Sequence, residues 1–209
     1  MKFSAIDRLG ENVTAYISRR GKLGNDASID WAIGVMNEGN VVADFDSDLI
    51  GNGSHADLKA VALSSGRQVQ GIDTRVTNYG YNSIGNILQH GVILEKATLT
   101  FNGIGHIIKG AKGADAQQES RVLMLSDQAR SDANPILLID ENDVTAGHAA
   151  SIGQVDPEDM YYLMSRGLDK ATAERLVVRG FLGSVIVEIP VKEVRDEMIA
   201  TIEEKLSKR

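Results

Sequence analysis

Short apolar runs separated by polar turns fill the first three quarters of the chain. The runs lie at 14–18, 29–36, 41–45, 58–63, 92–94, 97–101, 122–125 and 136–139. In several of them apolar side chains recur at every second position, as in Trp31, Ile33 and Val35, which is the period of a β-strand. No helical pattern lies between the runs, which argues against a sheet of alternating strands and helices. A β-sandwich, a barrel and a parallel β-helix remain open.

Clusters of glycine, asparagine and serine at 38–40, 51–53 and 64–66 predict turns between these runs. The pair Asn102-Gly103 is the best hairpin signal, although it equally suits a corner of a β-helix. The mixed spacing of the other turns and the abundance of small residues favour the β-helix, although no repeat is evident. The pattern of residues 1–155 therefore leans toward a β-helix, and the sandwich and the barrel stay open.

Residues 156–209 follow a helical pattern instead. Asp156 and Pro157 suit the N-cap and first position of a helix that should run to about residue 166. Gly167 suits the left-handed position that follows such a helix. Asp169 can then cap a second helix, which Pro190 should stop or kink.

The second and third predicted helices each have an apolar face. One side of the second helix carries Leu176, Val177, Phe181 and Val185. The last helix has an apolar stripe of Val194, Met198, Ile202 and Leu206. Its other face is charged, and we expect the solvated side chains there to be Glu193, Asp196, Glu197, Glu203, Glu204 and Lys205.

The composition narrows the function classes. The chain has 209 residues with 22 basic and 29 acidic side chains, and a net charge of −7 argues against a protein that binds nucleic acid. It has no cysteine, which excludes disulfides, a thiol nucleophile and an iron–sulfur cluster held by its own thiolates. No run approaches the roughly 18 apolar residues of a membrane span, and no signal peptide is evident at the start. We therefore expect a cytoplasmic protein.

His148 is the histidine with the most suggestive surroundings. It follows the polar segment 140–143, which offers four side chains with oxygen atoms, and small residues flank it. An imidazole near carboxylates can bind iron or zinc or relay protons. The alternative is an acidic turn followed by an ordinary histidine, and the other three histidines show no close two-histidine ligand spacing.

Paired aspartates and glycine-rich segments bear on two other chemistries. Asp44, Asp46 and Asp48 alternate as on one face of a strand, which is compatible with a polysaccharide-active β-helix enzyme. The same spacing is equally compatible with a polar loop, which we favour. An aromatic content of 5% is low for a sugar-binding groove. The glycine-rich segments 103–105 and 110–113 match neither a P-loop nor a dinucleotide motif, so we do not expect this chain to hydrolyse ATP by itself.

An ordered series of sequence blocks resembles the SufB/SufD family of the Suf iron–sulfur cluster assembly system. The blocks cover about 80 residues closely. They read FNGI at 101–104, ADAQQ at 114–118, VLMLSDQA at 122–129, NPILLID at 134–140, NDV at 142–144, GHAASIG at 147–153, YYLMSRGL at 161–168 and GF at 180–181. The resemblance implies a right-handed parallel β-helix followed by a small α-helical C-terminal domain, at 1–155 and 156–209. Family members are usually about twice as long and have an N-terminal helical region, so we expect this to be a C-terminal portion.

The resemblance also implies a role without catalysis. SufB and SufD pair through their β-helices, each holds one copy of the ATPase SufC, and a cluster is thought to assemble at the SufB–SufD interface. Relatives commonly read Cys-Ser-His-Gly-Ala where this chain has Ala146, Gly147, His148, Ala149 and Ala150. The histidine matches, so His148 becomes a candidate iron ligand or assembly-site residue. Because Ala146 occupies the cysteine position, the chain resembles SufD more than SufB.

The implied partners are a SufB-like paralogue that supplies thiolates and a SufC-like ATPase. Any iron or cluster would be held transiently and shared with a partner rather than bound tightly by this chain. For the ATPase we expect a docking site around Tyr161, Tyr162, Arg166 and Gly167, although the two tyrosines could equally be partly buried between helices. A purely structural dimerisation module remains an alternative, because unpaired strands would also promote a homodimer.

Overall fold

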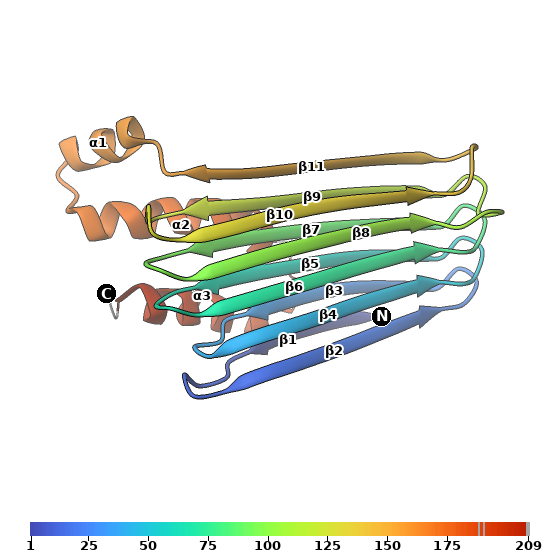
Figure 1. Ribbon diagram of the computed structural model, residues 1–209, viewed down its shortest axis with the longest axis horizontal. Helices are drawn as coiled ribbons and strands as arrows, with labels where there is room; N and C mark the ends of the chain where they lie inside the picture. Colours follow the sequence, from blue (N-terminus) through green and yellow to red (C-terminus); the bar gives the residue numbers. More distant parts are fainter. Residues whose placement is uncertain (188, 190, 208–209) are drawn as a thin grey trace.

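A computed structural model describes residues 1–187, 189 and 191–207. Within these residues eleven strands form two parallel sheets, a six-stranded sheet A in the order β1-β3-β5-β7-β9-β11 and a five-stranded sheet B in the order β10-β8-β6-β4-β2. Consecutive strands alternate between the sheets, so the chain winds as a flattened parallel β-helix (Figure 1). Three helices follow the strands. The fold class expected from the sequence is therefore confirmed.

The strands are mostly ten residues long, longer than the apolar runs that predicted them. Sheet A contains β1 (Lys2–Asp7), β3 (Ser28–Val35), β5 (His55–Ser64), β7 (Ile84–Ile93), β9 (Asp115–Met124) and β11 (Thr145–Gln154). Sheet B contains β2 (Thr14–Leu23), β4 (Asn40–Leu49), β6 (Val69–Asn78), β8 (Thr98–Ile107) and β10 (Arg130–Ile139).

The interior of the β-helix is filled by every second side chain of each strand. Phe45 and Phe101 are fully buried there, and the predicted alternation of Trp31, Ile33 and Val35 does point into this core. Register partners in the middle of sheet B lie 29 residues apart, as Asp44–Asp73 do. The repeat is hard to see in the sequence because stacked residues point to the same side of the sheet but differ in residue type.

A polar cross-link closes the first turn of the β-helix. Arg19 of β2 points inward and binds both carboxylate oxygens of Asp7, at 2.8 and 2.6 Å. Its guanidinium also lies 5.9 and 5.4 Å from the ring centroids of Phe3 and Phe45. The Arg19 charge is thus paired with the Asp7 carboxylate and stacked on two aromatic rings at the first turn of the core.

The expectation of a hairpin or corner at Asn102-Gly103 is wrong, because both residues lie inside β8. The Asn102 amide donates to Asp73 Oδ1 at 2.5 Å and accepts from Asn134 Nδ2 at 3.0 Å, which builds a polar ladder across sheet B. Gly103 faces the interior, where a Cβ would come within 2.7 Å of Gln118 Oε1. This glycine serves close packing rather than a turn.

The helix boundaries follow the predicted capping residues closely. Asp156 accepts from Glu158 N at 2.8 Å and begins α1 (Pro157–Ser165). Gly167 has φ +94°, the left-handed conformation that ends this helix. Asp169 accepts from Thr172 N at 2.8 Å and begins α2 (Lys170–Ile186). The expected role of Pro190 lies outside the described residues, and α3 spans Lys192–Ser207.

Helices α2 and α3 cover part of the outer face of sheet A, behind the strands in Figure 1. They share one apolar cluster with the sheet, in which Val178 and Leu182 of α2 and Met198 of α3 are fully buried. The face predicted for α2 is partly wrong, since Leu176 is half exposed. The stripe predicted for α3 is confirmed at Met198, Ile202 and Leu206.

Lys205 contradicts the expected solvated face of α3, because it is 7% exposed. Its ammonium group donates to the carbonyl oxygens of Asn37, Leu63 and Met36, at 2.5, 3.1 and 3.3 Å. These carbonyls lie at or just beyond the ends of β3 and β5 in sheet A. The side chain therefore anchors α3 to the sheet through charge-assisted hydrogen bonds. None of the described helices combines the length and apolarity that crossing a membrane requires.

Candidate functional site

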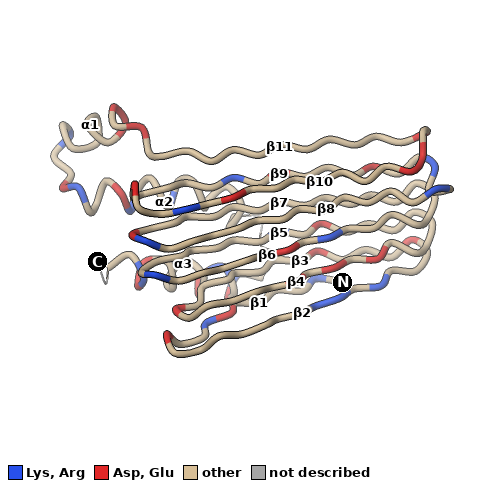
Figure 2. The backbone as a smooth tube through the Cα atoms, in the orientation of Figure 1, with Lys and Arg blue, Asp and Glu red and all other residues tan. Residues whose placement is uncertain are grey.

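The last turn of the β-helix ends in two open strand edges. In the described chain β11 pairs only with β9 and β10 pairs only with β8, so each is the outer strand of its sheet (Figure 1). Most side chains of β11 are exposed, and Figure 2 shows no charged residue along this strand. Large apolar side chains are also exposed at this end, at 40–45% for Ile136, Leu138, Ile139 and Ile152.

The backbone of β11 offers an unused hydrogen-bonding row. Thr145 N donates to Ala114 O at 3.0 Å, so Thr145 directs its backbone toward β9. Because successive residues of a strand turn their N–H and C=O groups to opposite sides, Ala146, His148, Ala150 and Ile152 direct theirs to the open edge. An edge of this kind is a template for another strand.

The edge of β10 shows the same alternation. Arg130 N donates to Ala97 O at 3.0 Å, so even-numbered residues of β10 pair with β8. Pro135 therefore falls on the open side, where its missing N–H breaks no bond within the sheet. The proline is thus compatible with β10 as an outer strand.

His148 lies at the mouth of the β-helix interior. It is aligned with Gln118 on β9, and Gln118 is aligned with Ile87 on β7. Both of these side chains point inward, so His148 occupies the corresponding inward position on the final strand. The residue is nevertheless exposed, because β11 is the last strand of its sheet. An accessible imidazole flanked by Ala146 and Ala150 can coordinate a metal or transfer a proton.

Two of the four oxygen-bearing side chains before His148 are engaged by neighbouring residues of the β-helix. The carboxylate of Glu141 accepts from Asn142 N at 2.9 Å and Gly110 N at 3.0 Å, and Lys109 lies 3.6 Å away. Asp140 lies 3.1 Å from His106 Nε2. No group of three or more potential metal-ligating side chains occurs among the described residues. Any metal at His148 would therefore need ligands from elsewhere.

The aspartates considered for sugar chemistry lie on one outward face of sheet B, within β4, so the polar loop favoured for them is wrong and the strand alternation is confirmed. Asp46 forms a 2.6 Å ion pair with Arg20, and Asp48 lies 4.0 Å from the same guanidinium. Asp44 accepts a 3.3 Å hydrogen bond from Tyr16. Burial, followed by the nearby charge of Asp46, raises the pKa of Asp44. The ion pairs give Asp46 and Asp48 a structural role in the outer face.

The residues expected to dock an ATPase lie on α1 and the following turn. Tyr161 and Tyr162 are 76% and 56% exposed, so more than half of each residue is accessible to a partner. The Arg166 guanidinium lies 5.1 Å from the Tyr162 ring centroid. Beside them is an open groove of about 420 Å³, lined in part by Leu125, Met160, Tyr161 and Met164. Sequence reasoning missed the methionines, whose spacing of four on α1 was the available signal.

The structure therefore defines a class of protein with an open-ended parallel β-helix, an accessible histidine on the edge strand and a helical layer on one sheet. Residues 1–181 match the family described as SUF system FeS cluster assembly, SufBD core domain. The chain belongs to this family.

Individual relatives agree. The chain is 50% identical over 205 residues to the iron–sulfur cluster assembly protein SufD of Bacillus subtilis, covering 98% of this chain and 47% of that protein. A SufBD family protein of Mycobacterium leprae is 28% identical over 194 residues, covering 92% of this chain and 22% of that protein. The chain thus spans less than half the length of these relatives, and within the family it is most like SufD.

The Glu141 carboxylate should make the turn before β11 sensitive to acid. Its hydrogen bonds with the amides of Asn142 and then Gly110 lower its pKa from 4.5 to about 2. Its contribution to stability is therefore complete above pH 4.5 and is lost as the pH falls toward about 2. Urea denaturation should show that Glu141→Gln is less stable than wild type at neutral pH, with a smaller difference at the acidic end.

The matched control is Asp143→Asn, which removes an exposed carboxylate from the same turn. This variant should keep the wild-type response to acid. Equal stability of Glu141→Gln and wild type across the whole pH range would contradict the assigned role.

Proposed function

We propose that this protein is a non-catalytic, SufD-like scaffold subunit of a cytoplasmic iron–sulfur cluster assembly complex. The observation that carries the proposal is the position of His148, on the open edge strand of a β-helix whose chain has no thiol. Family membership supports the assembly role. The absence of cysteine then limits what this chain contributes to the cluster.

We propose that a SufB-like paralogue pairs with the β10–β11 end. The unused backbone groups of β11 can hydrogen-bond to a partner strand, and the exposed Ile139 and Ile152, which are aligned with the buried Ile107 and Val122, would be covered on association. Strand addition of this kind places residues of both chains next to His148. A second copy of this chain could use the same edge, which accounts for the expected homodimer of the isolated chain.

The chemistry of the shared site follows from the ligands available. Iron–sulfur clusters are held mainly by thiolates, with histidine as a substitute ligand in some centres. His148 can supply one imidazole nitrogen to iron, and the partner would supply the cysteines. The cluster is cargo that forms at the interface and leaves it, so a single weakly held ligand on this side suits release.

We propose that α1 and its groove carry the docking site for a SufC-like ATPase. Tyr161, Tyr162 and Arg166 are presented together, and Met160 and Met164 line the adjacent groove. Aromatic, methionine and arginine side chains are enriched in protein interfaces. The chain has no P-loop sequence, so the energy of ATP would have to come from such a partner.

The polysaccharide-enzyme alternative has less support. Its carboxylates Asp46 and Asp48 both face Arg20, and nothing beyond their alternation favours sugar hydrolysis. The structural-module alternative differs from the scaffold proposal in one respect, because it gives His148 no role. A functional test of His148 therefore separates the two.

Replacing His148 should lower cluster formation without affecting the fold. The side chain is exposed, so His148→Ala should change the free energy of unfolding by no more than about 0.5 kcal/mol. Iron and sulfide content of the reconstituted complex, together with its visible absorption, would measure cluster yield. His55→Ala is the matched control, because His55 is also partly exposed but lies on β5, away from the open edge. A normal cluster yield from His148→Ala would remove the assigned role.

A proline on the open side of β11 should block strand addition. Ala150→Pro removes one N–H from the unused row and leaves the pairing with β9 in place, so association with a SufB-like protein should weaken strongly. Size-exclusion chromatography with light scattering would measure complex formation. Ala150→Val keeps the N–H and should bind almost normally. If the proline variant folds and still pairs like wild type, another surface must form the interface.

Truncating Tyr161 should weaken binding of the SufC-like ATPase without affecting the stability of the chain. With 76% of the residue exposed, Tyr161→Ala should leave stability within about 0.5 kcal/mol of wild type and weaken SufC binding severalfold in calorimetry. Tyr79→Ala is the control, since Tyr79 is exposed in the turn after β6. Unchanged ATPase affinity of the Tyr161 variant would place the dock elsewhere.

A further inference from the structure

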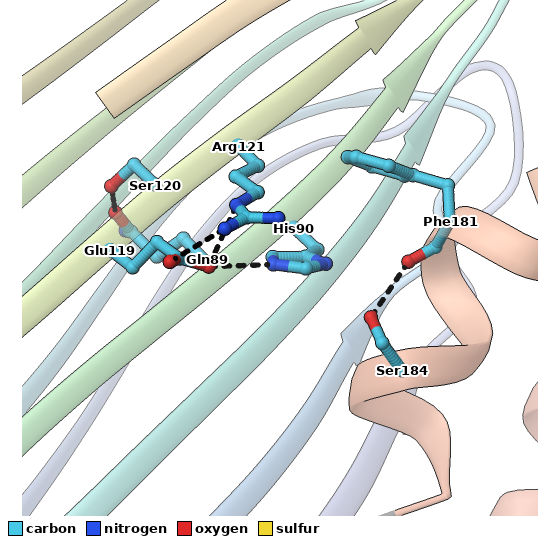
Figure 3. Close-up of polar contacts among 7 residues, drawn as sticks. All are labelled: Gln89, His90, Glu119, Ser120, Arg121, Phe181 and Ser184. Carbon is cyan, nitrogen blue, oxygen red and sulfur yellow. Dashed lines mark hydrogen bonds and ion pairs between the residues drawn. The ribbon is translucent and has the colours of Figure 1, made fainter. Parts of the chain in front are cut away.

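His90 is a buried titratable group at the junction between sheet A and the helices. It lies on β7, is 4% exposed, and points outward between Val61 of β5 and Arg121 of β9. Its imidazole stacks on the ring of Phe181 in α2, with 5.1 Å between centroids and 21° between the planes (Figure 3). The contact joins the middle of α2 to the sheet.

The surroundings suit a neutral imidazole better than a charged one. Nε2 lies 3.4 Å from Glu119 Oε1, but Arg121 already binds both oxygens of that carboxylate, at 2.9 and 3.0 Å. Nδ1 is fully buried and has no hydrogen-bond partner. The carbonyl of Phe181 already accepts from Ser184 Oγ at 3.0 Å. A second proton, on Nδ1, would have to share the Phe181 carbonyl with Ser184, and the ring would carry its charge while almost fully buried, which is costly.

We propose that His90 is a proton-sensitive latch for α2: the neutral ring keeps Phe181 seated on sheet A, and protonation loosens the helix around Phe181. The helix layer as a whole stays attached, because the shared apolar cluster and the Lys205 anchor do not depend on His90. The latch thus changes the local order of α2. Because α2 follows α1 after a short turn, protonation of His90 also changes how firmly α1 and its exposed surface are held.

The charges around the ring set the direction of the effect. Burial lowers the pKa of His90 below 6.5, opposed by Glu119 and the Phe181 backbone and assisted by Arg121. Lys59 of β5 and Glu119 of β9 lie in the same row across sheet A, on either side of Leu88. Val61, Phe181 and Ser184 bring no charge to the ring. The stabilisation is therefore complete above pH 6.5 and is lost as the pH falls through the lowered pKa.

Hydrogen exchange of the full chain tests the latch without any partner protein. Backbone protection of α2 is compared near pH 7.5 and near pH 5.5, either side of the ordinary histidine pKa of about 6.5, after correction for intrinsic exchange rates. Wild-type α2 should lose protection severalfold around Phe181 at the lower pH, while β3 and β5 keep theirs. His90→Phe, which preserves a stacked ring, and His90→Gln should both abolish this pH dependence.

The matched control is His106→Gln, a histidine of sheet B on β8, which should respond to pH as wild type does. The proposal is overturned if wild-type α2 shows the same protection at both pH values, or if the His90 variants lose protection as wild type does. Should both variants fail to fold, NMR titration of the wild-type chain decides. The Phe181 ring signals must then follow the protonation of His90, and their independence would also overturn the latch. Failure of this test leaves the scaffold proposal intact, because that depends on His148 and the open edge.

Discussion

Parallel stacking of strands is the constraint on which the rest of the structure depends. A strand inside either sheet has its backbone groups satisfied by the strands before and after it in the stack, about one turn of the β-helix away. The final turn has no following strand among the described residues, so β10 and β11 keep one unused side each. The surface most suited to a partner is therefore a consequence of the fold. Its polar backbone row and exposed apolar side chains need no special sequence motif.

The two faces of sheet A have different roles in the structure. Its inward face contributes the core, where Ser120 and Gln89 hydrogen-bond at 2.7 Å and Gln118 donates to Ile136 O at 2.9 Å. These cross-links hold the strands in position close to the open end, where His148 lies. Part of the outer face is covered by α2 and α3, which leaves α1 exposed. The β-helix thus presents two separate exposed surfaces, a strand edge and a helix.

Local sequence predicted well wherever local physics decides the structure. The caps Asp156 and Asp169 and the left-handed Gly167 were identified correctly, because capping involves only a few neighbouring residues. Strand β11 was missed, although it contains the candidate site. It is rich in small residues and lacks an apolar alternation, since neither of its faces is well buried. Asn102 was read as a turn residue because its ladder partners, Asp73 and Asn134, are distant in sequence.

The sequence by itself determined the strand-rich core, the helical end, the lack of thiols and the presence of a histidine that matches the family pattern. Each of these is a property of composition or of a short segment. Only the tertiary structure decided that His148 lies at the open mouth, that Lys205 is buried, and that His90 meets Phe181. Lys205 and Met36 are 169 positions apart. Such contacts depend on which strands stack and which face a helix covers, and no local pattern of residues encodes either choice.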